Sequence, residues 1–289
     1  MATILITGAS TGLGLATAKL LHARGHRLIV TAREESLGRF AEHPFTASDT
    51  VFVRALDVTN AEQRERIVLE AEERWRGIDV LINNAGVSYR SVFEHVTESE
   101  RQEQLDVNFR APMELIRLVL PGMRARRSGK ILNVSSVGGM MAMPTMSIYS
   151  ASKFALEGAS EALYYEVRPW NISVTLIEPG FINSDGFEKV RFTRLGAAAS
   201  IRPTSPYYAH YHNMDTFIQR IMRRAWATPE SVARTIVKNV ERRRPPLRVP
   251  ATLDAHLFRA LRYLLPQRLY HWVLYRSLPG VRTWANPQI

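Results

Sequence analysis

The chain of 289 residues contains no cysteine. Disulfide bonds, thiolate nucleophiles and cysteine-ligated metals are therefore excluded, which fits a reducing compartment. There is no run of about 18 apolar residues, so a membrane-spanning helix is not expected. The eight histidines form no H-E-x-x-H or comparable cluster, and no metal is expected. The first residues enter a strand-like run without the basic start and apolar stretch of a signal peptide, which predicts a cytoplasmic protein.

Acidic residues are fewer than basic ones, with 27 against 38 lysines and arginines, and the formal net charge is +11. The excess is concentrated at the end of the chain. Between Glu241 and Ile289 there are nine arginines and two acidic residues, Glu241 and Asp254. Charge alone does not choose among a membrane surface, a nucleic acid and an acidic protein as the partner. The arginines are spaced along apolar helices without a recognised base-reading module, so nucleic-acid binding is not predicted.

Short segments rich in Ile, Val and Leu alternate with longer segments of helical periodicity. The predicted strands are Thr3–Thr7, Arg27–Thr31, Val51–Leu56, Asp79–Ile82, Lys130–Val134 and Ser173–Ile177. The predicted helices are Leu13–Arg24, Ala61–Arg74, Glu98–Arg126, Tyr149–Val167 and Pro229–Arg242. Strands that are apolar on both faces and alternate with helices indicate a parallel sheet covered on both sides. The predicted fold class is α/β, with a doubly wound, Rossmann-like sheet in a single domain.

Two parts of the chain depart from this alternation. Residues 183–227 follow the sixth strand, are rich in aromatic, Met and Pro residues, and are predicted to form a substrate lid. Beyond the catalytic domain, which we expect over residues 1–250, a basic amphipathic C-terminal extension covers residues 251–289. This extension offers two short helical segments, Asp254–Leu265 and Gln267–Leu278.

A glycine-rich turn follows the first predicted strand and leads directly into a helix. Its sequence is Thr7-Gly8-Ala9-Ser10-Thr11-Gly12-Leu13-Gly14. Glycines let the backbone turn sharply and approach a pyrophosphate, and the N–H groups and dipole of the helix N-terminus favour the anion. A plain tight turn is the alternative, but the position between the first strand and a helix favours dinucleotide binding.

The spacing of this turn is T-G-x-x-x-G-x-G, and two further elements follow it in order, Asp57-Val58 after the third strand and Asn83-Asn84-Ala85-Gly86 after the fourth. Together they resemble the short-chain dehydrogenase/reductase family. The resemblance implies that the cofactor is held by Gly8, Ser10, Thr11, Gly12, Leu13 and Gly14. It places Asp57 and Val58 beside the adenine, and Asn84, Ala85 and Gly86 on the cofactor side of the sheet. From the residues alone, the alternative for Asp57 is a loop cap after a strand.

The choice of nicotinamide cofactor depends on the end of the second strand, which reads Thr31-Ala32-Arg33. An acidic residue there would accept hydrogen bonds from a ribose 2′-hydroxyl group and repel a 2′-phosphate. Arg33 suits a 2′-phosphate, because its planar donors pair with phosphate oxygens. The alternative is an exposed arginine paired with Glu34 or Glu35. NADP(H) is therefore the favoured cofactor, and NAD(H) is the alternative.

A candidate catalytic group follows the fifth strand. Ser136 precedes Tyr149 by thirteen residues and Lys153 follows it by four, so the tyrosine and the lysine share one helix face. A tyrosine is a poor base at neutral pH unless a nearby cation lowers its pKa. Serine, tyrosine and lysine at these distances resemble the catalytic site of the same family.

This resemblance implies a role for each side chain. Tyr149 would exchange the hydroxyl proton, Ser136 would bind the substrate oxygen, and Lys153 would lower the pKa of the tyrosine and bind the nicotinamide ribose. Asn108 matches the asparagine that holds a proton-relay water. Ser135 is the adjacent alternative to Ser136, and the thirteen-residue spacing favours Ser136.

A second cofactor segment is expected after the sixth strand. It resembles the family stretch that touches the nicotinamide carboxamide and consists of Pro179, Gly180, Ile182 and Ser184. Members of the family often have threonine in place of Ser184, and a hydroxyl group is retained here. These groups allow hydride transfer at a carbon atom with proton exchange at its oxygen.

Apolar side chains crowd the segments expected around the substrate, namely Met140, Met141, Met143, Met146, Phe181, Phe187, Phe192, Tyr207, Tyr208, Tyr211 and Phe217. Such adaptable surfaces suit bulky apolar ligands, and simple filling of the core beneath a lid is the alternative. The chain resembles the family subgroup that acts on steroids, retinoids or other lipid-like alcohols and ketones. A cofactor-binding sensor without turnover is the second function considered, and the intact Ser136, Tyr149 and Lys153 argue against it.

The two helical segments of the extension are amphipathic. In the first, one apolar face is expected from Leu257, Phe258, Leu261, Leu264 and Leu265, with Arg259 and Arg262 largely off it. The second combines side chains that suit a water–lipid boundary, Leu269, Trp272, Val273 and Leu278 with Arg268, Arg276, Tyr270 and Tyr275. We expect either peripheral contact with an anionic membrane surface or packing on the protein body or on the mate of a homodimer.

Overall fold

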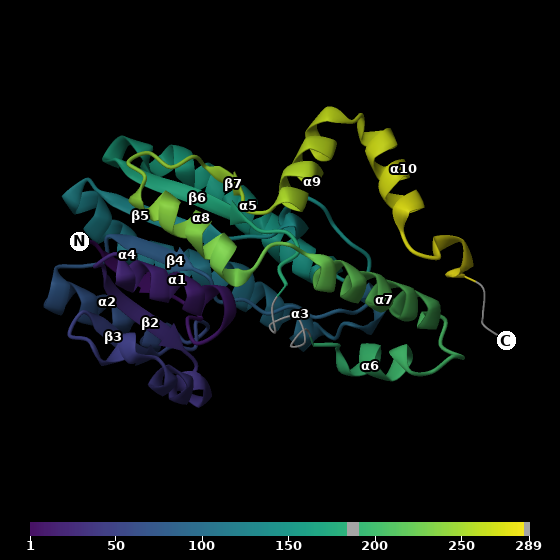
Figure 1. Ribbon diagram of the computed structural model, residues 1–289, viewed down its shortest axis with the longest axis horizontal. Coiled ribbons are helices and arrows are strands. Elements are labelled where there is room, and N and C mark those ends of the chain that lie inside the picture. Colours follow the sequence, from purple (N-terminus) through teal and green to yellow (C-terminus); the bar gives the residue numbers. More distant parts are fainter. Residues whose placement is uncertain (184–190, 286–289) are drawn as a thin grey trace.

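A computed structural model gives the structure of the chain and describes residues 1–183 and 191–285 (Figure 1). Seven strands form one sheet in the order β3-β2-β1-β4-β5-β6-β7, and every neighbouring pair is parallel. The strands are β1 (Thr3–Ile6), β2 (Arg27–Ala32), β3 (Val51–Ala55), β4 (Val80–Asn83), β5 (Gly129–Val134), β6 (Ile172–Glu178) and β7 (Arg248–Pro250). The predicted doubly wound α/β sheet in a single domain is confirmed.

Helices cover both faces of the sheet, because successive residues of a strand point to opposite faces. In β1, Ile4 and Ile6 pack in one core with Leu21 of α1 and Ile236 of α8. Leu5, between them, packs in the opposite core with Leu115 of α4. The helices are α1 (Gly12–Ala23), α2 (Ala61–Trp75), α3 (Glu98–Leu105), α4 (Ala111–Arg126), α5 (Ser147–Val167), α6 (Arg194–Ser200), α7 (Tyr208–Arg224), α8 (Pro229–Glu241), α9 (Leu253–Leu264) and α10 (Gln267–Ser277).

Two predicted elements differ from the structure. The single helix expected over Glu98–Arg126 is divided into α3 and α4 by a π-helical turn at Asp106–Arg110. A π turn inserts one residue into an otherwise regular helix and leaves the apolar periodicity on either side intact, so the pattern did not show it. The sequence also predicts six strands, whereas β7 adds a seventh at the edge. Three residues are too few for a period to be recognised.

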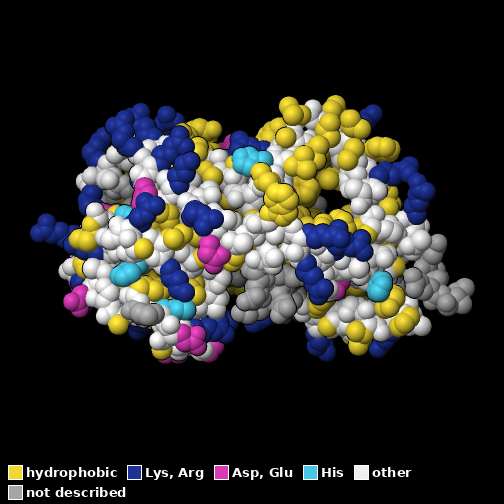
Figure 2. Space-filling view, viewed as in Figure 1, with side chains coloured by type: hydrophobic (Ala, Val, Ile, Leu, Met, Phe, Trp, Pro, Cys, Tyr) yellow, Lys and Arg dark blue, Asp and Glu magenta, His cyan; other side chains and the backbone are white. Residues whose placement is uncertain are grey.

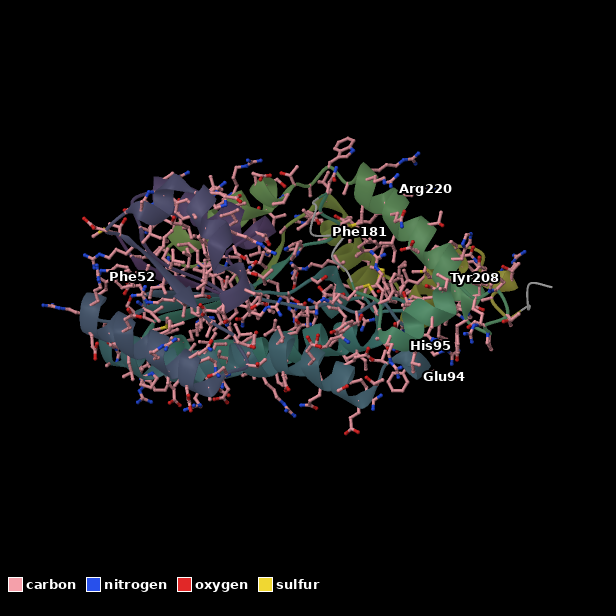
Figure 3. The ribbon with its side chains drawn as sticks, turned by 90° about the horizontal axis from the view of Figure 1, so that it is seen from below. Phe52, Glu94, His95, Phe181, Tyr208 and Arg220 are labelled. Carbon is pink, nitrogen blue, oxygen red and sulfur yellow. The ribbon has the colours of Figure 1, made fainter. Side chains whose placement is uncertain are left out.

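The expected lid contains α6 and α7, and hydrogen bonds of its tyrosines connect it to the rest of the protein. The N–H group of Val92 donates to the Tyr211 hydroxyl oxygen at 3.2 Å, and the Nδ1 atom of His95 lies 2.9 Å from the same oxygen. The Tyr207 hydroxyl group donates to Glu94 at 2.7 Å. Figure 3 shows Glu94 and His95 beneath the start of α7. These two tyrosines therefore pack the segment onto the body, and Phe187 lies outside the described residues.

The C-terminal extension packs on the methionine segment. Met140 and Met141 are buried in one cluster with Tyr270 of α10, and Phe258 and Leu261 of α9 contact this cluster. These two methionines therefore pack against apolar side chains of α9 and α10. They are not exposed toward the space expected for a substrate. Among the described residues, no helix is long and apolar enough to cross a membrane.

Candidate active site

The glycine-rich turn after β1 has the backbone conformation that glycine permits. Gly8 and Gly12 have φ angles of +64° and +56°, a region that side chains with a Cβ atom rarely adopt. At Gly14 the constraint is space, because a Cβ atom there would lie 2.3 Å from the Gly8 carbonyl oxygen. The turn thus lies directly against the first turn of α1.

Asn84 and Thr7 hold this turn against the end of β4. The Nδ2 atom of Asn84 donates to the carbonyl oxygens of Thr7 and Gly8 at 2.9 and 3.0 Å. The Thr7 hydroxyl oxygen accepts the N–H groups of Asn84 and Ala85, both at 3.0 Å. The Asn84 side chain therefore stabilises the turn, and its amide group donates its hydrogen bonds to the protein backbone.

The start of α1 fits an anionic ligand. Thr11 precedes the helix in an extended conformation, and among the described residues its side chain makes no capping hydrogen bond. The first N–H groups of an α-helix have no partner inside the helix, and its dipole favours a negative charge there. Left-handed glycines beside an uncapped helix start suit the pyrophosphate of a dinucleotide, so the residues present fit a nicotinamide cofactor.

The residues expected around the adenosine end lie in two loops. Asp57 is exposed, and its Oδ1 atom accepts the N–H and hydroxyl groups of Thr59 at 2.9 and 2.7 Å, which makes it a loop cap. Val58 is buried and packs in the core. Arg33 lies after β2, and its Nε atom is 3.0 Å from Glu35, with both side chains more than half exposed. The pairing with Glu35 that the sequence left open is thus present.

Ser136 and Tyr149 meet where β5 ends and α5 begins. A Cβ atom at Gly138 would lie 2.9 Å from Cε1 of Tyr149, so glycine lets the ring approach the backbone beside the serine. The Ser136 hydroxyl oxygen accepts the N–H group of Gly138 at 3.0 Å. Burial raises the pKa of Tyr149 above its usual value, and a hydrogen bond with Ser136 opposes this. The lowering of the tyrosine pKa by Lys153 stays a prediction.

Lys153 lies one turn after Tyr149 on α5, as expected from their spacing. Only 6% of it is exposed, its Nζ atom donates to the Val134 carbonyl oxygen at 2.9 Å, and Nζ lies 5.9 Å from the centre of the Tyr149 ring. The pKa of Lys153 is lowered to about 8, because the lowering by burial exceeds the opposing effect of the Glu157 carboxylate. At neutral pH the side chain is therefore still largely an ammonium group.

Asn108 occupies the π-helical turn and holds the loop after β4. Its Oδ1 atom accepts the N–H group of Val87 at 2.9 Å, and its Nδ2 atom donates to the Val87 carbonyl and the Ser152 hydroxyl at 2.8 and 3.0 Å. A Cβ atom at Gly86 would lie 3.3 Å from Asn108 and 3.9 Å from the Lys153 Nζ atom. Asn108 thus brings the loop of residues 84–87 against the lysine.

Comparison with known proteins agrees with this geometry. A family model described as short chain dehydrogenase matches residues 2–194. The chain belongs to the short-chain dehydrogenase/reductase family. It is 35% identical over 279 residues to 3-ketodihydrosphingosine reductase of Bacteroides thetaiotaomicron, with 94% of this chain and 96% of that protein covered. It is 33% identical over 256 residues to retinol dehydrogenase 8 of Homo sapiens, with 85% and 80% covered.

Among solved structures, a short-chain dehydrogenase from Streptomyces avermitilis has a TM-score of 0.77 and 31% identity, with 96% of this chain and 98% of that chain covered. The chain is therefore an NAD(P)-dependent oxidoreductase that acts on alcohol or ketone groups. Within the described residues, no group of His, Asp or Glu side chains is arranged to hold a metal ion.

The segment after β6 of this family member is tied to both the serine loop and the extension. The N–H group of Val137 donates to the Pro179 carbonyl at 2.8 Å. On the other side, the N–H group of Gly180 donates to the Thr252 hydroxyl at 2.9 Å, and that of Phe181 donates to Asp254 at 2.8 Å. Thr252 caps α9, so the extension begins against the predicted cofactor segment. Ile182 packs on the core, and Ser184 lies outside the described residues.

A buried charge network beside Lys153 was missed in the sequence. Ser135 donates to Oε1 of Glu157 at 2.6 Å, and Arg248 of β7 pairs with the other carboxylate oxygen of Glu157 at 2.5 Å. Arg248 also pairs with Glu178, which is fully buried, at 2.8 Å and with Glu161 at 3.0 Å. Ser135 is thereby engaged away from Tyr149, which leaves Ser136 as the hydroxyl group beside the tyrosine.

One residue of this network was within reach of sequence reasoning. Glu157 follows Lys153 by four residues on the same helix face, the spacing that already joins Lys153 to Tyr149. Arg248 carried no such signal, since it reaches the site only through the pairing of β7 with β6.

Glu157→Gln should move the alkaline limb of the pH profile to lower pH. Lys153 loses its proton as the pH rises through about 8, and the Glu157 carboxylate raises that pKa. Without the negative charge, the ammonium form is lost at a lower pH, and proton transfer that depends on it falls earlier. The measurement is kcat/KM for ketone reduction across pH.

Glu161→Gln is the matched control, because Glu161 is also paired with Arg248 but lies half exposed and two turns from Lys153. It should leave the limb in place. A limb that stays at the wild-type pH in Glu157→Gln would show that Glu157 does not set the charge of Lys153.

Proposed function

We propose that the enzyme transfers a hydride between NADP(H) and the alcohol or ketone carbon of a bulky, apolar substrate, with Tyr149 exchanging the proton. The observation that carries the proposal is the grouping of Ser136, Tyr149 and a buried Lys153 at the carboxyl edge of the parallel sheet, beside an uncapped helix start. In open α/β sheets, ligands bind at this edge.

When bound, the nicotinamide ring supplies or accepts the hydride. The Ser136 hydroxyl group binds the substrate oxygen and orients it toward Tyr149. Tyr149 has a raised pKa and is protonated at neutral pH, so it can donate its proton to the carbonyl oxygen during reduction. Oxidation is the reverse transfer, in which the phenolate form of Tyr149 accepts the alcohol proton. The Lys153 ammonium stabilises the phenolate that reduction leaves behind. Asn108 positions the loop of residues 84–87 against Lys153 through its bonds to Val87.

Tyr149→Phe should keep the fold and cofactor binding but lower kcat by about 10² to 10⁴-fold, because the ring fills the same space while the proton-exchanging hydroxyl group is gone. The measurements are cofactor affinity by titration and turnover with a ketone panel. Tyr165→Phe is the control, since it makes the same deletion at an exposed position of α5. Activity of Tyr149→Phe within about tenfold of the parent would reject the assignment.

The preference for NADP(H) rests on Arg33. Its guanidinium group lies after β2 and pairs with the exposed Glu35, and a surface pair of this kind is worth little. A 2′-phosphate carries more charge than one carboxylate and accepts two guanidinium hydrogen bonds, so it competes well for Arg33.

Arg33→Asp should reverse this preference. A carboxylate at this position repels a 2′-phosphate and accepts hydrogen bonds from a 2′-hydroxyl group, so kcat/KM should fall far more with NADP(H) than with NAD(H). Arg39→Asp, at an exposed position six residues later, controls for the change in net charge. Equal losses with the two cofactors would mean that Arg33 does not contact the phosphate.

An apolar substrate is supported by an open cavity of about 710 Å³ between the end of α7, the start of α8 and the start of α9. Phe181, Ile221 and Trp226 are among its lining residues, with Leu253 at the α9 side. Phe181 lies within the predicted cofactor segment, between Gly180 and Ile182, so the cavity reaches that segment. Two relatives are named for a sphingoid ketone and for retinol, which supports a lipid-like alcohol or ketone. The homodimer and the cytoplasmic location stay predictions.

A further inference from the structure

Helix α9 has two apolar faces, of which one is covered by the protein. Phe258 and Leu261 point toward the buried methionines Met140 and Met141, and the ring of Phe258 lies 6.3 Å from that of Phe181. Ala255 on the same side is fully buried. The sequence predicts one apolar face for this helix, whereas the structure divides its apolar residues between an inner and an outer face.

The outer face of α9 is a stripe of exposed leucines. Leu253, Leu257 and Leu264 lie four and then seven residues apart, which places them on one line along the helix. Their exposed fractions are 75%, 56% and 79%. A helix that is apolar on both sides is normally covered on both sides, so this stripe indicates a partner.

Helix α10 continues the exposed surface with aromatic residues. Tyr270 is buried against the body, while Trp272 and Tyr275 are 56% and 58% exposed on the other side together with Leu269. The guanidinium group of Arg276 lies 5.6 Å from the centre of the Trp272 ring. Exposed tryptophan, tyrosine and arginine side by side suit the boundary between water and lipid. Figure 2 shows the apolar side chains gathered over α9 and α10, with basic side chains at their margin.

Charge decides which partner suits this surface. Residues 251–285 contain one acidic residue, Asp254, and five arginines, Arg259, Arg262, Arg268, Arg276 and Arg282. Asp254 is engaged inward, because its carboxylate accepts the N–H group of Phe181. In a two-fold dimer the same patch meets itself, so a second copy would bring arginines against arginines without acidic partners.

We propose that the outer faces of α9 and α10 dock the enzyme on an anionic lipid bilayer. The leucine stripe and the aromatic side chains enter the boundary between headgroups and acyl chains, and the exposed Arg268 and Arg276 of α10 face lipid phosphates. Arg262 lies over the buried ring of Tyr270 and is engaged on the inner side. Figure 1 shows the two helices projecting from the body at the far end of the chain, where a flat surface can reach them.

The docking surface lies next to the proposed substrate cavity. Leu253 belongs to both the leucine stripe and the cavity lining. Its neighbours Thr252 and Asp254 accept the N–H groups of Gly180 and Phe181. A lipid-like substrate that leaves the bilayer would therefore have a short path to the cavity. This step rests on the proposed function, whereas the docking itself does not.

Flotation of the full-length protein with vesicles tests the docking. The expected result is binding to vesicles of phosphatidylserine and phosphatidylcholine at low salt, weaker binding at high salt, and little binding to phosphatidylcholine alone. Leu257→Gln/Leu264→Gln should lower vesicle affinity at least about tenfold by removing apolar area from the contact. Arg268→Gln/Arg276→Gln should lower it about 25-fold, since each basic residue near an anionic surface contributes about fivefold.

Matched controls distinguish binding through this surface from non-specific binding of exposed leucines and arginines elsewhere on the protein. Leu69→Gln removes an exposed leucine from α2, and Arg66→Gln/Arg124→Gln removes two exposed arginines from α2 and α4. Both controls should float like the wild type, and all variants should keep wild-type turnover of a small, water-soluble ketone. That turnover, measured without vesicles, tests the proposed function separately from the docking.

Three outcomes would overturn the proposal. The first is a wild-type protein that does not float with anionic vesicles at low salt, and the second is unchanged flotation in both α9 and α10 variants. The third is a protein that does not bind vesicles but forms a dimer that Leu257→Gln/Leu264→Gln dissociates, which would make the surface a contact between copies of the chain.

Discussion

A buried ammonium group is the constraint on which the site is built. An unpaired charge in a dry interior is costly, so Lys153 must be compensated by fixed polar groups. Val134 supplies a carbonyl oxygen from the end of β5, and Glu157 supplies negative charge from the next turn of α5. The carboxylate of Glu157 is itself buried and is held by Arg248 from the edge strand. The charge of one side chain therefore links α5, β5 and β7, and its proximity to Tyr149 follows from the helix spacing.

The same architecture explains why function gathers at one end of the molecule. When helices cover both faces of a parallel sheet, ligands reach it at the ends of the strands. The carboxyl ends of all strands lie on the same side of the sheet, its carboxyl edge. The glycine turn after β1, the loop of residues 84–87 after β4, and Ser136 after β5 all lie at this edge. The extension does not stand apart from it, because α9 starts against Gly180 and Phe181. Cofactor, substrate and lipid surface are thus proposed to meet at neighbouring parts of one edge.

Much of this was predictable from the sequence, where local patterns determine the structure. Strands apolar on both faces gave the sheet, and the spacing of Tyr149 and Lys153 gave their shared face. Features that depend on tertiary contacts were missed. The π turn around Asn108 leaves the helical periodicity intact, and the raised pKa of Tyr149 depends on burial that spacing does not report. Likewise, the sequence analysis predicted one apolar face for α9 where the structure has two. Hydrophobicity alone does not show which leucines pack against the methionines.

The central claim is that this site moves a hydride to or from a lipid-like carbon. The most direct measurement is a single-turnover reaction of the purified protein with NADPH carrying deuterium at its transferable position and a panel of steroid, retinoid and long-chain ketones. Mass spectrometry of the product should find one deuterium on the new carbinol carbon, while the hydroxyl hydrogen comes from solvent. Binding of the cofactor without deuterium transfer to any of these ketones would contradict the claim and make the protein a cofactor-binding module without turnover.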